Sequence, residues 1–303
     1  MSHPALLVSA AHKSSGKTTV TLALAAALAA RGHAVQPFKK GPDYIDPMWL
    51  TLAAGRPCIN LDPQLMGWDE ITQVFAQRMR GADIGLVEGN KGLYDGLALD
   101  GSNSNAALAK LLGLPVLLVL DARGMTRGIA PLILGYQAFD ARIRIAGVIL
   151  NQLGGARHES KLRAVIEHYT NVPVLGAIGH DPRLALVERH LGLMPNHELM
   201  DAAQRVRAMG ELVAAQVDLA KVRAVAASAA PLVPPERASS TRGAAWINAH
   251  CPPSASVQAP SVRGLIALPG ANATSTVVGS RRNSSACGRC RLATDGQGDG
   301  GGM

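Results

Sequence analysis

The chain has 303 residues, of which 48% are hydrophobic, 17% charged and 3% aromatic, and its formal net charge is +8. A chain of this length buries enough apolar surface to form one large α/β domain or two smaller ones, which excludes a small disulfide-stapled scaffold. Four unevenly spaced cysteines are too few for a secreted framework, and the apolar start at 4–11 lacks a cleavage pattern, so we expect a cytoplasmic protein. No apolar run reaches the roughly 18 to 20 residues of a membrane-spanning helix, so no membrane partner is expected.

The positive charge is unevenly distributed along the chain. Residues 239–303 contain six Arg, two Asp and no Lys, which accounts for half of the net charge of +8. A nucleic-acid footprint clusters on a folded face and is accompanied by a reading motif. This pattern therefore argues against a nucleic-acid partner.

Short apolar runs alternate with longer helical stretches from residue 5 to about residue 220. In chain order, the pattern predicts a strand at 5–10, a helix at 17–31, a strand at 34–38, a helix at 69–80, a strand at 84–88, a helix at 103–112, a strand at 115–121, a helix at 127–139, a strand at 143–150, a helix at 157–169, a strand at 173–178 and a helix at 198–218. Several strands are continuously apolar, as in a parallel sheet covered on both faces. This alternation indicates an α/β fold with a doubly wound, mostly parallel sheet of the P-loop NTPase type.

The composition changes after Ala230. Pro231, Pro234 and Pro235 open a linker, and the following residues are rich in Ser, Ala, Gly, Pro and Arg without a clear helical or strand period. We therefore predict a folded domain at 1–230 and a linker with a low-complexity, disordered tail at 231–303.

A phosphate-binding loop is predicted at 11–19, where Ala-His-Lys-Ser-Ser-Gly-Lys-Thr-Thr joins the first strand to the first helix. In a Walker A loop, backbone N–H groups cradle the phosphates, the lysine reaches the β and γ oxygens and the threonine hydroxyl ligates Mg²⁺. The alternative is an ordinary helix N-terminus capped by Ser. The expected nucleotide-binding residues are Ser14, Ser15, Gly16, Lys17, Thr18 and Thr19.

Acidic turns follow three of the predicted strands. They lie at 39–47, 88–96 and 121–124, and the first two contain Asp43, Asp46, Glu88 and Asp95. A single Asp in a Gly-rich turn is more often a turn former. However, the carboxyl ends of parallel strands converge on the edge that holds the phosphate loop. Carboxylate oxygens there suit Mg²⁺, so the three turns together favour a site.

Ordered sequence blocks give the chain a family resemblance from Ala5 to about Glu198. This region resembles the amino-terminal synthetase domain of the cobyrinic acid a,c-diamide synthase family. The resemblance rests on the blocks Ser15–Thr19, Gln36–Lys39, Gly41–Pro47, Gly55–Pro57 with Asn60–Asp62, Glu88–Gly89 with Gly92–Gly96, Gly147–Asn151 and Glu188–Leu193.

The resemblance implies an ATP-dependent amidoligase. In that family, ATP activates side-chain carboxylates of a corrin or related tetrapyrrole as acyl phosphates, and ammonia from glutamine then forms the amide. It implies that Lys17 and Thr18 hold the triphosphate and Mg²⁺, and that the acids Asp43, Asp46 and Glu88 ligate or position the metal. Asp95 would lie where carboxylate and ammonia meet, and Asn151 resembles an adenine-reading Asn of related enzymes.

We therefore predict Lys17, Asp95 and Asp43 as catalytic residues, with Thr18, Asp46 and Glu88 as metal ligands. The predicted cofactors are ATP and Mg²⁺. Attack of a carboxylate on a phosphate brings anions together, so cations such as Lys39, Lys40 or Lys91 are expected to offset charge.

Two departures from the family pattern bear on the partners. Asn90 and Lys91 stand where the family usually has small or apolar residues, so sirohaem stays open as the acceptor in place of a corrin. No cysteine-based glutaminase domain fits in 239–303, and the loss of family character after Pro235 suggests a truncated or frame-shifted reading. We therefore expect the chain to use free ammonia or a separate glutaminase, and leave a homodimer open.

A partition-like ATPase is the alternative of a different class. Its signature lysine would stand five residues before Lys17, where this chain has His12. The Gly-Pro-Asp-Tyr turn at 41–44 is also not needed by that class.

Overall fold

The computed structural model describes residues 3–186, 188–189 and 192–232. Apart from its first two residues, the predicted tail at 231–303 lies outside the described residues. Among those that are described, no helix is both long and apolar enough to cross a membrane.

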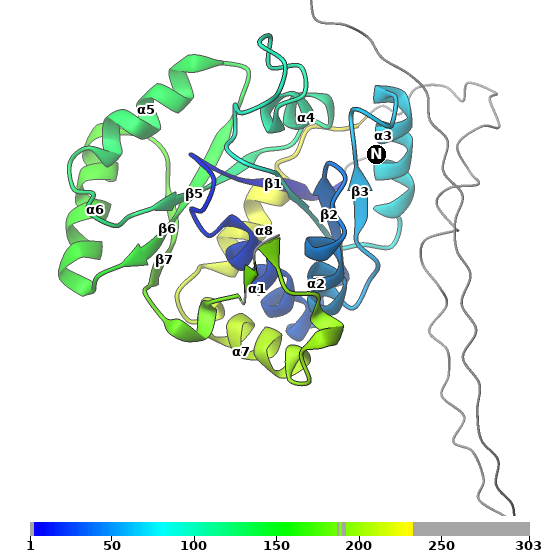
Figure 1. The fold of residues 1–303 in the computed structure, drawn as a ribbon. Coiled ribbons are helices and arrows are strands. Elements are labelled where there is room, and N and C mark those ends of the chain that lie inside the picture. Colours follow the sequence, from blue (N-terminus) through cyan, green and yellow to red (C-terminus); the bar gives the residue numbers. More distant parts are fainter. Residues whose placement is uncertain (1–2, 187, 190–191, 233–303) are drawn as a thin grey trace, which may run out of the picture. The chain divides into compact units, whose positions relative to one another are not determined.

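A seven-stranded parallel sheet forms the centre of the described domain (Figure 1). Its strand order is β3-β2-β4-β1-β5-β6-β7, and every neighbouring pair is parallel. The fold class expected from the sequence is therefore confirmed. The strands are β1 (Ala5–Ala10), β2 (Val35–Lys40), β3 (Ile59–Leu61), β4 (Ile84–Glu88), β5 (Val116–Asp121), β6 (Ile145–Leu153) and β7 (Val174–Gly179).

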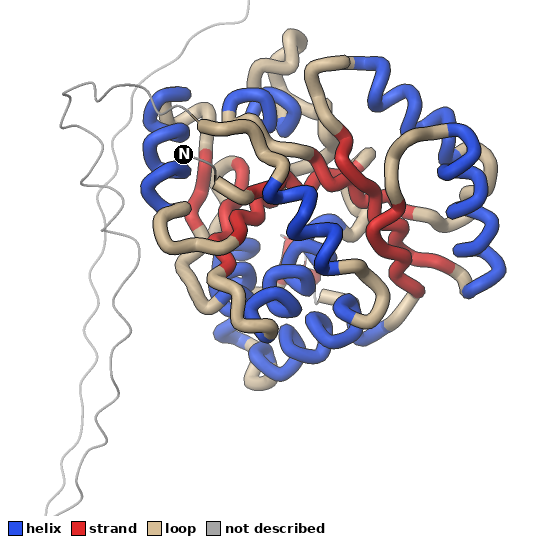
Figure 2. The backbone as a smooth tube through the Cα atoms, turned by 180° about the vertical axis from the view of Figure 1, so that it is seen from behind, coloured by secondary structure: helices blue, strands red, loops and turns tan. Residues whose placement is uncertain are grey.

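Helices cover both faces of the sheet, as the view from behind also shows (Figure 2). One face packs against α1 (Lys17–Ala30), α2 (Ile45–Ala54), α7 (Ala202–Ala214) and α8 (Leu219–Ala227). The other packs against α3 (Trp68–Arg78), α4 (Asn105–Leu111), α5 (Ile129–Phe139) and α6 (Ala156–Tyr169). Two short 3₁₀ turns, Pro182–Leu184 and Asn196–Glu198, and a hairpin of β8 (Glu188–Arg189) and β9 (Gly192–Leu193) lie between β7 and α7.

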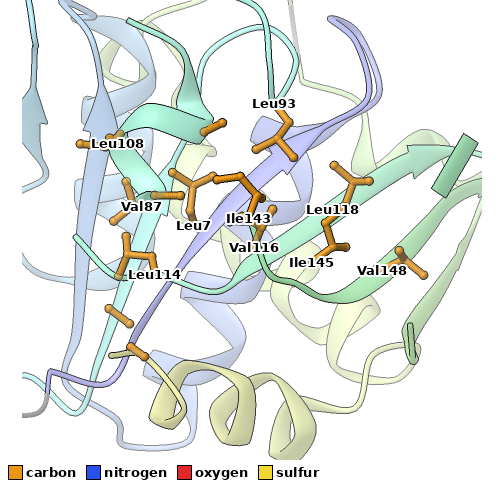
Figure 3. Close-up of a cluster of buried hydrophobic side chains, with 14 of the residues drawn as sticks. Leu7, Val87, Leu93, Leu108, Leu114, Val116, Leu118, Ile143, Ile145 and Val148 are labelled. Carbon is orange, nitrogen blue, oxygen red and sulfur yellow. The ribbon is translucent and has the colours of Figure 1, made fainter. Parts of the chain in front are cut away.

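Continuously apolar strands explain why the sheet is covered on both sides. All six residues of β1 are buried, and Leu6 and Leu7 face opposite cores although they are adjacent in sequence. Figure 3 shows Leu7, Val87 and Val116 of neighbouring strands close together in one of these cores. Burial of each such side chain contributes about 1.5–3 kcal/mol.

The first helix is buried almost all round because it lies between the sheet and α7. Every residue from Val20 to Leu28 is buried. Close packing of the two helices depends on small residues, since a Cβ added to Gly210 would come within 3.0 Å of Ala26 Cβ and 3.1 Å of Ala27 N. The helix that begins at the phosphate loop is therefore fixed on two sides.

Several elements differ from the sequence prediction. The segment expected as an acidic turn continues into α2 at Ile45, and β3 was not predicted. The predicted helix at 198–218 is observed as the shorter α7, and α8, which begins at Leu219, was not predicted. Asp218 caps this additional helix, with its Oδ1 accepting from Lys221 N at 3.0 Å.

Candidate active site

The phosphate loop lies between β1 and α1, where the strand order of the sheet reverses. Its turn needs left-handed backbone at Ser14, with φ of 66°, and at Gly16, with φ of 84°. A Cβ on Gly16 would also collide with the Asn151 amide. Gly16 is the residue before α1 and has no side-chain cap there, so the backbone N–H groups of the first turn are available to a ligand.

Asn151 supports this loop from the end of β6. Its side chain is buried, and Nδ2 donates to the Ser15 carbonyl oxygen at 2.9 Å. Ser15 is itself buried, and its hydroxyl donates to the His12 carbonyl at 2.9 Å. Ser14 is exposed and Thr19 is half-buried, on the loop and the first turn of α1 respectively. The residues predicted to bind nucleotide thus lie together, with Asn151 in contact with the loop.

Glu88, the last residue of β4, is the centre of a chain of charges beside the loop. Its fully buried Oε1 accepts from Lys17 Nζ at 2.8 Å, from Thr18 Oγ1 at 2.5 Å and from Lys39 Nζ at 3.1 Å. Lys39 also donates to Asp46. Lys17, Thr18, Asp46 and Glu88, which the sequence placed in one site, are therefore brought together, and Lys39 joins them.

The pKa values of these groups follow from burial and mutual charge. Burial opposes ionisation of Glu88, but the Lys17 and Lys39 ammonium groups outweigh it and lower its pKa to about 2. Burial raises the pKa of Asp46 to about 6, the Glu88 carboxylate adds to the rise, and Lys39 opposes it. Burial also disfavours the Lys39 cation, yet the neighbouring carboxylates raise its pKa overall. Lys39 is therefore a permanently charged cation inside the site.

Asp43 shapes the start of α2. Its Oδ1 accepts from the backbone N–H groups of Ile45 at 3.0 Å and Asp46 at 3.1 Å, so it closes an Asx turn. Its other oxygen lies 3.7 Å from Lys39 Nζ. Asp43 is thus at the edge of the charged cluster, with a structural task in addition to its predicted catalytic one.

Asp95 is held by a different turn. Its Oδ2 accepts from Gly92 N at 2.9 Å, and its side chain lines an open cavity of about 850 Å³. The turn reaches the end of β1, where the phosphate loop begins, because Leu93 N donates to the Ala10 carbonyl at 2.8 Å. In the described residues, no hydrogen bond or ion pair joins Asp95 to Lys17, Asp43 or Glu88. The structure therefore places Asp95 beside the loop but outside the charged cluster.

Asn105, the first residue of α4, was not predicted as a site residue. It is completely buried, and its Oδ1 accepts from Asn90 N at 3.1 Å. Its Nδ2 lies within hydrogen-bond distance of Ser9 Oγ and of the carbonyl oxygens of Asn90 and Gly92. It therefore pins the turn after Glu88 to β1. The sequence offered only an Asn near a predicted helix start, and the cap itself is Ser104, whose hydroxyl accepts from Ala107 N at 3.1 Å.

The third acidic turn is occupied by a local ion pair. Asp121 accepts from Arg123 N at 3.0 Å and binds its guanidinium through both oxygens. The same Asp-X-Arg turn recurs at Asp140 with Arg142 and at Asp181 with Arg183. The repetition at three separate loops indicates that Asp121 has a turn-forming role.

Comparisons with known proteins agree with this geometry. A family model described as the CobQ/CobB/MinD/ParA nucleotide binding domain matches residues 7–193. A cobyrinate a,c-diamide synthase of Magnetococcus marinus is 48% identical over 233 residues, which are 77% of this chain and 50% of that protein. A hydrogenobyrinate a,c-diamide synthase of Thermobifida fusca is 47% identical, over 76% of this chain and 49% of that protein. The chain belongs to the cobyrinic acid a,c-diamide synthase family.

Within this family, the chain spans about half the length of the curated relatives it matches. Its similarity to a solved structure, the MinD cell division protein of Aquifex aeolicus, has a TM-score of 0.45 at 14% identity, covering 76% of this chain and 99% of that one. The matched domain is a nucleotide-binding one, and the curated relatives are named synthases.

Proposed function

We propose that the chain is an ATP-dependent amidoligase domain that converts side-chain carboxylates of a tetrapyrrole polycarboxylate, of the cobyrinic acid type, into amides. ATP would activate the carboxylate as an acyl phosphate, and ammonia would displace the phosphate. The observation that carries the proposal is the buried chain Lys17–Glu88–Lys39–Asp46 directly beside the phosphate loop. The names of the curated relatives support the acceptor class.

The residues present fit Mg²⁺. Glu88 Oε2 is buried and has no hydrogen-bond partner, which is an unusual state for a carboxylate oxygen. Within the described ranges, no group of three or more His, Cys, Asp and Glu side chains is placed to hold a metal alone. Mg²⁺ commonly takes one or two carboxylates together with substrate phosphates and water. Thr18, Asp46 and Glu88 would hold it, and it would neutralise charge on the triphosphate.

Lys17 and Lys39 would have separate tasks. Lys17 stands at the loop and would release Glu88 to reach the phosphates, as a phosphate-loop lysine does. Lys39 stays protonated because three carboxylates surround it, and its side chain is only 3% exposed. A fixed cation there would reduce the repulsion between an attacking carboxylate and the phosphate. Asp95, exposed on the cavity next to the loop, would orient the carboxylate and the incoming ammonia.

The test is ADP formation by the full chain with Mg²⁺-ATP, cobyrinic acid and ammonium chloride. We expect ADP to appear only when the acid is present, and mass spectrometry to show the acid converted to its amide. When the substrate carboxylates are labelled with ¹⁸O, one labelled oxygen should appear in the released phosphate. The oxygen that bridges carbon and phosphorus in the acyl phosphate leaves with the phosphate when ammonia attacks the carbon. Sirohaem in a parallel assay shows whether it serves as the acceptor.

One lysine variant tests the role of the phosphate loop, and a second lysine variant is its matched control. Lys17→Gln should abolish the activity, whereas Lys161→Gln, an exposed lysine on α6, should leave it unchanged. ADP formation at the same rate without any tetrapyrrole acid, or phosphate free of label, would overturn the proposal.

A further inference from the structure

Lys40 is a second buried lysine, adjacent to Lys39 but in a different environment. Successive residues of a strand point to opposite faces of the sheet. Lys39 is surrounded by three carboxylates, whereas Lys40, 5% exposed, forms no ion pair with any residue of the described chain. Among the described residues, Lys40 Nζ donates one hydrogen bond, to Asn90 Oδ1 at 3.1 Å. A buried ammonium held only by a neutral amide is an expensive arrangement.

The turn after β4 brings another cation to the same place. Lys91 is exposed, carries a left-handed backbone with φ of 44°, and forms no ion pair in the part of the chain that is described. Lys91 follows Asn90, the residue to which Lys40 donates. Burial lowers the pKa of Lys40, and the Lys91 charge lowers it further. Non-glycine residues in this backbone region cluster at functional sites. Both cations thus adjoin Asn90, Lys40 through its hydrogen bond and Lys91 as the next residue of the chain.

Asp62 is a negative charge that acts on Lys40 without forming an ion pair with it among the described residues. It raises the pKa of Lys40. Its Oδ1 accepts from Gln64 N at 3.0 Å, and its Oδ2 is buried without a hydrogen-bond partner. Among the described residues, neither Lys40 nor Lys91 therefore has a carboxylate as an ion-pair partner.

We infer that Lys40 and Lys91, with the Asn90 amide between them, bind a second carboxylate of the acceptor acid, one that is not being activated. Lysine ammonium groups and an amide N–H are suitable donors for a carboxylate. The inference rests on the proposed function and deepens it.

The position of the subsite constrains the acceptor. Asn90 is two residues beyond Glu88, and Lys40 is the residue after Lys39, so the subsite adjoins the charged cluster at the same edge of the sheet. The turn that carries Asn90 and Lys91 is pinned by Asn105. An acid that fills both places must carry at least two carboxylates on neighbouring side chains, as the rim of a tetrapyrrole does.

The test compares the full-length parent chain with Lys40→Gln, Lys91→Gln and the double variant. We expect KM for cobyrinic acid to rise about 10- to 100-fold in the double variant, because charge-assisted hydrogen bonds to the substrate are lost. We expect kcat to stay within about twofold, as for an interaction made equally in ground and transition states. Affinity for ATP, measured with a fluorescent analogue, should not change. Lys91→Arg should restore binding, and Lys161→Gln is the matched control.

Several outcomes would overturn the inference. An unchanged KM in Lys91→Gln, whose exposed side chain is not needed for folding, would contradict it, as would a parallel loss of ATP affinity, which would assign the cations to phosphate. If the parent chain forms no ADP with the acid, the proposed function is wrong, but the subsite can still be tested. Equilibrium dialysis then measures the binding of cobyrinic acid to the parent and to the double variant, and equal affinities would overturn the inference.

Discussion

Asp46 is an acid of the charged cluster whose pKa lies above its ordinary value. The ordinary pKa of this carboxyl is 3.8, and in the folded chain burial and the Glu88 carboxylate raise its pKa to about 6. The Lys39 ammonium acts in the opposite direction but does not cancel the rise. The folded state therefore binds this proton more tightly than the unfolded state. The resulting contribution to the free energy of unfolding is fully present below about pH 4 and is lost as the pH rises through about 6.

We expect Asp46→Asn to reduce the fall in Tm between about pH 5 and pH 7 and to give a higher Tm than the parent at pH 7. The measurement is thermal unfolding by circular dichroism, without nucleotide and with a chelator. Glu88, with its pKa lowered to about 2, changes stability only at lower pH and does not interfere. Glu167→Gln, an exposed acid on α6, is the control. Parallel pH curves for parent and Asp46→Asn would contradict the prediction.

Asn151 could support the phosphate loop or recognise the adenine base of ATP. Binding of a polyphosphate that lacks a base distinguishes these two roles. Because its amide donates to the Ser15 carbonyl, we expect Asn151→Ala to loosen the phosphate loop and weaken ATP binding about 10-fold. If loop support is its role, inorganic tripolyphosphate should lose affinity to the same degree. If the residue reads adenine, only ATP should be affected. Competition against a fluorescent nucleotide measures both ligands.

The residues of the phosphate loop could be predicted because their chemistry is local. A strand, a Gly-Lys-Thr segment and a helix suffice to identify Lys17 and Thr18. Lys39 was named only as one of several cations, because its central position depends on Glu88 and Asp46 approaching from β4 and α2. Asn105 could not be recognised, since its value comes from burial between β1 and a turn 15 residues earlier.

At the level of elements, the turn between β4 and α4 depends on one amide. Asn105 is fully buried and bonds to both the N–H and the carbonyl of Asn90. We expect Asn105→Ala to lower the free energy of unfolding by about 2–4 kcal/mol, because several buried polar groups lose their partner. Urea unfolding measures the loss.

The control for Asn105 is Asn171→Ala, an exposed amide that accepts from Gln137 at 2.9 Å and should change stability by less than about 0.5 kcal/mol. Equal effects of the two variants would show that the turn is held by other contacts.

The missed elements have physical reasons. α2 begins inside a motif rich in turn formers, where Asp43 serves as the acceptor for the first backbone N–H groups. β3 has three residues, too few for a periodic signal, and pairs only with β2. The start of α8 depends on a tertiary contact, because Asp218, the residue before it, donates its N–H to the Leu175 carbonyl of β7 at 2.8 Å.

For the molecule as a whole, the sequence predicted the parallel sheet, its coverage on both faces and the edge that carries the site. These follow from continuous apolar strands, from their alternation with helices and from the shared edge formed by the carboxyl ends of parallel strands. It did not predict which helices share a face. That arrangement depends on the strand order, in which β1 lies between β4 and β5.

The burial of α1 beneath α7 has a consequence for biosynthesis. The helix that carries Lys17 is complete at Ala30, yet the helix that covers it begins only at Ala202. A nascent chain therefore leaves the ribosome with the leucines of its first helix still without their cover. The first helix gains its second packing partner only after synthesis has reached α7.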